Sequence, residues 1–223
     1  MGPQVDQTPP AKGFLFRPSD HTYWLDGRHL PGCTTVIEDA GIYDLHGHTC
    51  DSCGHQTGGI PKKVLAKAAE RGTKVHLATQ YFDQGILDVD TVHPDLIPYV
   101  EAWGSFRLNE RFIPDPNWLE VPTWHTKFLY GVTPDRYGFL GGQKAIVEIK
   151  CTYAVAKYWS IQTAAQAHAL ASQGVDVDPQ TVVRLALKLN KDGTYTMDRH
   201  DKPGDFAEFM ACLRVYGMKR KYK

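Results

Sequence analysis

The sequence predicts a mixed α/β or α+β fold, in which a central mixed β-sheet is flanked by helices. Runs of strand-forming residues alternate with runs of helical periodicity along most of the chain. An Asp-Gly pair at 26–27 and another at 192–193 each separate two short apolar runs, which is typical of a β-hairpin. The resulting order is helix, strands, helix, strand pair and helix, which suits a sheet covered by helices.

These patterns place the elements along the chain. Residues 1–13 are polar, include three prolines and are expected to form a flexible tail. The hairpin at 26–27 leads into a helix whose expected first residue is Thr34 or Thr35. The later expectations are a helix over 61–85 interrupted at Gly72, a helix over 98–112, strand-like residues over 118–135, a hairpin within 131–150, a helix over about 158–173, two strands within 182–200, and an amphipathic helix from 205 onwards with a basic end.

Composition limits the classes of protein that the chain can represent. Its 223 residues, 42% of them hydrophobic, suit one domain, expected over 14–223 with a Cys/His-rich insertion at about 44–60. The formal net charge is zero, so any nucleic-acid partner must be recognised by a local site rather than by overall charge. No apolar run reaches the length of a membrane span, and five cysteines do not suggest a disulfide framework. We therefore expect a cytoplasmic protein with no membrane partner.

The stretch over 131–170 carries the candidate chemistry. Asp135 ends the first expected strand, and Glu148 and Lys150 lie two residues apart in the second. Alternate side chains of a strand point to one face, so Glu148 and Lys150 project together while Ile149 turns into the core. A turn that folds back would bring Asp135 beside them. Two carboxylates and one ammonium group at one edge suit a divalent cation with a water molecule held next to it.

The Glu-x-Lys pattern alone is weak evidence, because most isolated matches are solvated ion pairs on a surface strand. Here Glu148 lies within an apolar run, where a charged side chain is costly unless it is paired or bound to a metal. Pro134 and Asp135 lie upstream, and the helix that follows carries Gln162 and Gln166. These additions favour a functional site over a surface ion pair.

A Gly-x-x-x-His motif at Gly72 and His76 precedes Pro134-Asp135, Glu148-Ile149-Lys150 and Gln162 in the chain. With these motifs in this order, the sequence resembles the PD-(D/E)XK nuclease superfamily, and more closely its RecB-like and Cas4-like branch, near the phage exonucleases. Gln166 stands where the family has a tyrosine, which leaves the role of that position open. The opening over 21–41 also resembles the start of phage exonucleases, so the likeness runs from about His21 to about Tyr216. The matching residues are Gly72 and His76 of a Gly-x-x-x-His motif, Pro134-Asp135 and Glu148-Ile149-Lys150 of the core motif, and Gln162 of a Gln-x-x-x-Tyr motif.

The resemblance implies a restriction-endonuclease-like core that binds Mg²⁺ or Mn²⁺. His76 would supply a nitrogen ligand, which would shift the metal preference of the site towards Mn²⁺. Lys150 would orient the attacking water and stabilise charge on the phosphate, and proximity to a metal can lower the pKa of such an ammonium group. Gln162 would hold the attacking water or contact DNA. The implied metal ligands are His76, Asp135, Glu148 and the backbone carbonyl of Ile149.

Further residues are candidates for DNA contact. Arg71 and Lys74 would contact backbone phosphates. The rings of Tyr158 and Trp159 would stack on an unpaired base, and Gln166 would line the same groove as Gln162. Solvated helix charges and core packing are the alternative interpretations, and for the aromatic rings core packing is favoured. Glu120 is interpreted as an exposed strand residue rather than as a carboxylate that supports the metal ligands. The candidates for DNA contact are Arg71, Lys74, Tyr158, Trp159 and Gln166.

A loop rich in glycine, histidine and cysteine precedes the second expected helix. It has the ligand types of a small structural zinc site, which two cysteines and two of three histidines would close. No second cysteine pair lies at the usual spacing, so a Gly-rich insertion without metal is the alternative. The candidate zinc ligands are His46, His48, Cys50, Cys53 and His55.

The function expected from the resemblance is a metal-dependent DNA exonuclease. The resemblance also implies that this exonuclease is of the phage type. Its substrate would be single- or double-stranded DNA, and its role would lie in recombination, repair or processing, with a recombination or repair protein as an implied partner. An endonuclease on the same fold, a non-catalytic nucleic-acid-binding module and a small-molecule metal hydrolase are the alternatives. The intact set of Asp135, Glu148 and Lys150 speaks against the module.

Overall fold

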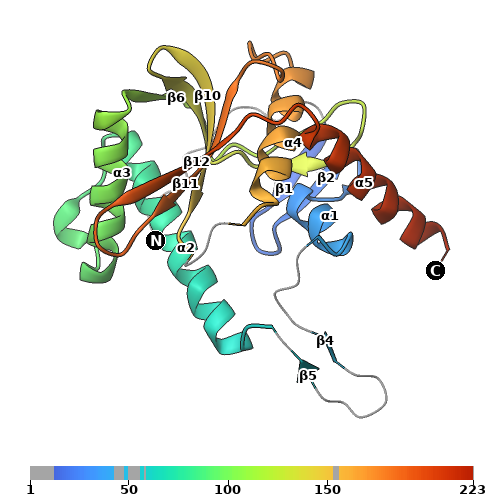
Figure 1. Cartoon of the computed structure of the whole chain (residues 1–223), viewed down its shortest axis with the longest axis horizontal. Coiled ribbons are helices and arrows are strands. Elements are labelled where there is room, and N and C mark those ends of the chain that lie inside the picture. Colours follow the sequence, from blue (N-terminus) through green and yellow to red (C-terminus); the bar gives the residue numbers. More distant parts are fainter. Residues whose placement is uncertain (1–12, 43–47, 50–55, 58, 153–155, 223) are drawn as a thin grey trace.

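A five-stranded mixed sheet lies at the centre of the fold, with the strand order β12-β11-β10-β9-β6 (Figure 1). The computed structural model describes residues 13–42, 48–49, 56–57, 59–152 and 156–222. β10 and β11 are parallel, whereas the other neighbouring strands are antiparallel. The predicted fold class is therefore confirmed. The strands of this sheet are β6 (Phe112–Leu119), β9 (Arg136–Leu140), β10 (Gln143–Lys150), β11 (Val183–Leu189) and β12 (Tyr195–His200).

Helices cover both faces of this sheet (Figure 1). α2 and α3 share a hydrophobic core with alternate residues of β10, from Ala145 to Ile149. α4 covers the other face, where it shares a core with Ile146, and α1 and α5 pack on α4. Since side chains alternate along β10, Glu148 and Lys150 are directed towards α4. The helices are α1 (Cys33–Asp39), α2 (Lys62–Asp83), α3 (Ile97–Asn109), α4 (Trp159–Ser172) and α5 (Asp205–Lys221), with short 3₁₀ turns η1 (Val89–Thr91) and η2 (Pro94–Leu96).

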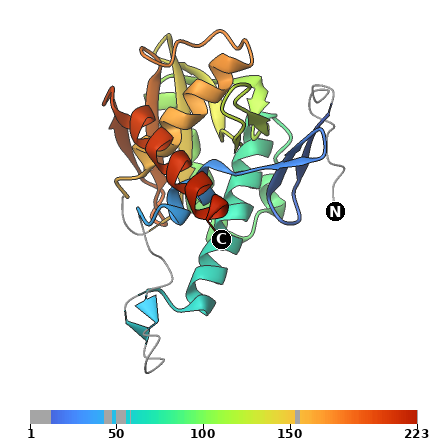
Figure 2. The ribbon, with the colours of Figure 1, turned by 90° about the vertical axis from the view of Figure 1, so that its right-hand side faces the viewer.

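Three smaller sheets complete the described part of the chain. The N-terminal sheet has its own core, in which Phe14 stacks on Trp124 with ring centroids 4.4 Å apart. Figure 2 shows this sheet (dark blue) at one edge of the molecule, and β4 and β5 beyond the N-terminal end of α2. The smaller sheets are β1 (Phe14–Arg17), β2 (Thr22–Leu25) and β3 (Arg28–Leu30); β7 (Thr123–Trp124) and β8 (Gly131–Val132); and β4 (His48–Thr49) and β5 (Gln56–Thr57).

The hairpins and the long helices lie close to their predicted positions, but three expectations were wrong. Asp135 does not end a strand; it directly precedes β9, because Pro134 has no N–H to continue a ladder after β8. The strand-like run over 118–135 is divided among the end of β6, β7 and β8. α2 continues through Gly72, because the cost of one glycine in a helix, about 1 kcal/mol, does not end a well-packed helix.

Some expectations concern parts of the chain that the structure does not describe. Residues 1–12 of the predicted tail and most of the insertion at 44–60 lie outside the described residues. The division into a tail and one domain stays a prediction. Among the described residues, no helix is both long and apolar enough to cross a membrane.

Candidate active site

A cavity of about 590 Å³ lies between α2, the N-terminal sheet and the sheet edge at which β10 ends. It is of the size that binds small ligands. Five of the six residues predicted to act in catalysis or to bind Mg²⁺ or Mn²⁺ line it, although they come from distant parts of the sequence. The polar residues around the cavity are His21, Tyr23, Thr34, Thr73, His76, Gln80, Glu120, Thr133, Asp135, Glu148, Lys150, Gln162 and Gln166.

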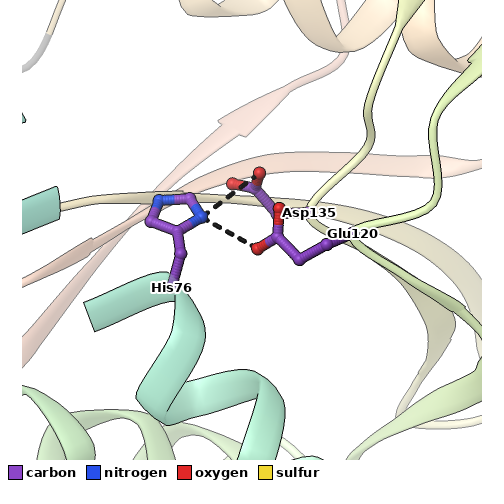
Figure 3. Close-up of side chains that lie close together, drawn as sticks. All are labelled: His76, Glu120 and Asp135. Carbon is purple, nitrogen blue, oxygen red and sulfur yellow. Dashed lines mark hydrogen bonds and ion pairs between the residues drawn. The ribbon is translucent and has the colours of Figure 1, made fainter. Parts of the chain in front are cut away.

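Three potential metal ligands converge in this cavity (Figure 3). The Nδ1 atom of His76 lies 2.9 Å from Oε1 of Glu120 and 3.5 Å from Oδ1 of Asp135. Among the described residues, these three form the group whose ligand atoms all lie within 4.8 Å of one another. One imidazole nitrogen and two carboxylates are a suitable donor set for Mn²⁺ or Mg²⁺.

The chain brings the three ligands together through the ends of its elements. His76 lies on the buried half of α2, whereas Glu120 directly follows β6 and Asp135 directly precedes β9. The backbone N–H of Glu120 donates to the carbonyl of Asp135 at 3.0 Å, so the two strand ends are joined. Glu120 has a φ of +56°, an uncommon conformation for a residue other than glycine. Backbone strain of this kind is concentrated at functional sites.

A buried arginine next to Asp135 fixes the position of Glu120. The guanidinium of Arg136 is fully buried and donates to Glu120 Oε1 at 3.0 Å and to Asp83 Oδ2 at 2.6 Å. It also donates to the Thr79 hydroxyl and to the backbone carbonyl of Asp135. Glu120 therefore lies between a fixed cation and His76, and its carboxylate has little freedom to turn away from the cavity.

Glu148 is the centre of a second network. Its Oε1 accepts hydrogen bonds from Lys150 at 2.7 Å and from Gln162 at 2.6 Å, and its Oε2 accepts one from Gln166 at 2.6 Å. Asp135 joins the two networks, because its Oδ2 accepts from the backbone N–H of Ile149 at 2.6 Å. The two glutamines lie one turn apart on α4, which is why both amides reach the same carboxylate. The side-chain carbonyl oxygen of Gln166 is buried and has no partner among the described residues.

The electrostatics of the site favour a bound cation. Burial, together with the neighbouring carboxylate of Glu148, raises the pKa of Asp135 well above its usual range. Burial lowers the pKa of His76, but the carboxylates of Asp135 and Glu120 raise it more strongly, to about 9. Without a metal, a protonated His76 therefore supplies the positive charge between the carboxylates. Burial lowers the pKa of Lys150, but the carboxylates of Glu148 and Asp135 raise it more strongly. A lowering of this pKa by a bound metal stays a prediction.

The raised pKa of His76 predicts that metal binding strengthens with pH. Its imidazole must lose a proton to bind a metal, so Mn²⁺ affinity should rise by about tenfold per pH unit from pH 7 to about pH 9. The stability that the metal-free protein gains from protonated His76 is fully present below pH 6.5 and is lost as the pH rises through about 9.

Mn²⁺ titrations by calorimetry between pH 6.5 and pH 9 would measure this dependence. Replacing His76 with glutamine should flatten it, because glutamine has no proton to release. A wild-type affinity that does not change over this range would contradict a role for His76 as a ligand.

The structure brings together the residues of the predicted core motif. Glu148 and Lys150 project to the same side and Ile149 is buried in the core, as strand alternation predicts. His76, Gln162 and Gln166 line the same cavity. A role for the Ile149 carbonyl as a ligand stays a prediction. Sequence analysis missed Glu120, which is not an exposed strand residue but a partner of His76.

The structure agrees less well with the predicted DNA contacts than with the predicted core motif. Trp159 is only 2% exposed, so it packs in the core, as the favoured interpretation has it, and the alternative that its ring stacks on a base was wrong. Tyr158 is partly buried against the core of α1, α4 and α5. Arg71 donates to the backbone carbonyl of Cys151, and Lys74 pairs with Glu70 in the preceding turn. Phosphate contacts by Arg71 and Lys74 stay predictions.

The candidate zinc ligands cannot be placed. His46, Cys50, Cys53 and His55 lie outside the described residues, and so does the side chain of His48. The zinc site therefore stays a prediction.

Comparisons with known proteins find similarity to solved structures but none to family models or curated sequences. No protein-family model matches the chain. No curated protein sequence matches it either. Among solved structures, an alkaline exonuclease (LHK-Exo) from Laribacter hongkongensis is similar with a TM-score of 0.37 and 15% identity, over 86% of this chain and 93% of that chain. LHK-Exo in complex with dAMP gives a TM-score of 0.29 and 18% identity, over 70% of this chain and 86% of that chain. TM-scores this low do not establish a common fold or a shared activity.

Proposed function

We propose that this protein is a divalent-metal-dependent nuclease that hydrolyses phosphodiester bonds of DNA as an exonuclease. The observation that carries the proposal is the convergence of His76, Glu120 and Asp135 in one cavity with Lys150. A hard cation site with an ammonium group in the same cavity suits an anionic phosphodiester, whose hydrolysis requires both a polarised water and neutralised phosphate oxygens.

The side chains have distinct roles in this proposal. His76, Glu120 and Asp135 would hold Mg²⁺ or Mn²⁺, together with Glu148 and the Ile149 carbonyl that the core motif implies. When bound, the metal lowers the pKa of a bound water and neutralises charge on the phosphate.

Lys150 contributes its positive charge beside the phosphate. Its Nζ is held by Glu148 at 2.7 Å and by the side-chain oxygen of Gln162 at 3.3 Å. Its pKa is raised, so it remains an ammonium group at neutral pH and acts as an electrostatic contact rather than as a base. Gln162 and Gln166 fix Glu148, which in turn fixes Lys150.

The finer assignment rests on the order of the sequence motifs. On that order we propose membership of the RecB-like branch of the PD-(D/E)XK superfamily, a phage-type role in recombination, repair or processing, and a recombination or repair protein as partner. An endonuclease on the same fold would use the same residues. A non-catalytic binding module is disfavoured, because it would not need Lys150 beside a set of metal ligands.

Digestion of end-labelled linear DNA and closed circular DNA, with Mg²⁺, Mn²⁺ or EDTA, tests the proposal. We expect metal-dependent shortening of linear DNA only, and a loss of about 10²–10³-fold in rate on replacing Lys150 with alanine, because a preorganised charge at the phosphate is removed. Cutting of closed circles would favour the endonuclease. Binding without cleavage under any of these conditions would favour the module.

A further inference from the structure

A second residue of the cavity wall has an uncommon backbone conformation. His21 ends the turn over 18–21 that joins β1 to β2, and its φ is +53°. This left-handed conformation is uncommon outside glycine, because the Cβ atom lies close to the following carbonyl oxygen; asparagine, aspartate and histidine adopt it most often among the other residues. Such outliers are concentrated at functional sites.

The strained turn places the His21 ring at the cavity, and three contacts fix it there. The ring lies edge-on to Phe16 and Tyr23, with centroids 5.0 and 5.6 Å away. The Tyr23 hydroxyl lies 3.1 Å from His21 Nε2 and 2.9 Å from the Thr133 hydroxyl. Tyr23 itself is buried, so this chain of hydrogen bonds anchors an exposed ring to the protein interior.

The anchor leaves one polar atom of the ring available. Nε2 is used by Tyr23, whereas Nδ1 has no hydrogen-bond partner among the described residues. If Thr133 donates to the Tyr23 hydroxyl and Tyr23 donates to Nε2, the neutral ring carries its proton on Nδ1. The unpartnered Nδ1 is then a hydrogen-bond donor on a ring that lines the same cavity as His76, Glu120 and Asp135.

We propose that His21 is a substrate-contacting residue that donates from Nδ1 to a phosphate oxygen of the DNA strand in the cavity. This inference rests on the proposed function and deepens it. A phosphate oxygen is an acceptor only, so it selects the tautomer that has its proton on Nδ1. His76, Glu120 and Asp135 would hold the metal that binds the reacting phosphate, and His21 would hold the backbone at the cavity wall, which would fix the register of the strand.

The test compares His21→Gly with His21→Asn. Glycine removes the donor and the backbone strain together, so its melting temperature should stay near the wild-type value while affinity for DNA falls. Asparagine tolerates a positive φ and keeps an N–H donor, so it should retain most of the affinity. A fluorescein-labelled single-stranded oligonucleotide in EDTA is the probe, and we expect about tenfold weaker binding for glycine, which corresponds to about 1.4 kcal/mol.

Asp26→Gly is the matched control. Asp26 also has a positive φ, +49°, and lies in the turn between β2 and β3 of the same sheet, but it does not line the cavity. It should leave oligonucleotide binding unchanged. Equal binding by wild type and His21→Gly would overturn the proposal, as would equal losses for His21→Gly and Asp26→Gly. A wild-type protein that binds the oligonucleotide but cleaves no DNA would refute the proposed nuclease. The binding of His21→Gly would still test the His21 contact in that case.

Discussion

Replacing Asp135 with asparagine is expected to lower the rate of DNA cleavage by about a thousandfold, which corresponds to about 4 kcal/mol of barrier. Asp135 lies between the two networks, with one oxygen near His76 and the other on the Ile149 N–H. Asparagine keeps an oxygen for the Ile149 N–H but removes the negative charge that a cation needs. Single-turnover cleavage of linear DNA at saturating Mn²⁺ would measure the loss.

The same substitution separates activity from folding. Because burial raises the pKa of Asp135, its carboxylate is costly in the metal-free protein, and a neutral amide should not lower the melting temperature in EDTA. Mn²⁺ should raise the melting temperature of the wild type, since a ligand stabilises the state that binds it, and should not raise that of Asp135→Asn. Cleavage within tenfold of wild type would contradict the assignment.

Local periodicity is what made the core motif predictable. In β10, the alternation of side chains is a property of any strand, so Glu148, Ile149 and Lys150 could be assigned to their faces without knowing the fold. The helix after β10 was recognised from its apolar spacing, and its glutamines reach Glu148 because they lie one turn apart. These inferences require only the neighbouring residues of the chain.

Glu120 could not be assigned in this way, because its role depends on long-range pairing. It reaches His76 only through the pairing of β6 with β9, which joins Leu119 to Arg136. A signal was present in the sequence, since Arg136 begins an apolar strand and a buried arginine needs a carboxylate partner. That signal predicts an additional acidic residue near Asp135, but it does not distinguish Glu120 from Asp83.

Replacing Arg136 with methionine is expected to destabilise the fold by about 3 kcal/mol, because the buried Asp83 carboxylate loses its fully buried partner and keeps the partly exposed Arg107 at 2.8 Å. For a domain of this size, the melting temperature should fall by about 6–12 °C. The pKa of Asp83 is already raised by burial despite Arg136, so this carboxylate is costly even when paired. Thermal unfolding in EDTA would measure the loss, free of any contribution from metal binding.

Adding Asp83→Asn to Arg136→Met distinguishes the two roles of Arg136. The amide removes the buried charge and can still accept from Trp103, which donates to Asp83 at 2.9 Å, so a large part of the stability should return. Cleavage should not return, because Glu120 still lacks the Arg136 guanidinium, which donates to it at 3.0 Å and holds it beside His76. Recovery of cleavage together with stability would mean that Arg136 acts through folding alone. Recovery of stability without cleavage would mean that one buried arginine both joins α2 to the sheet and positions a metal ligand.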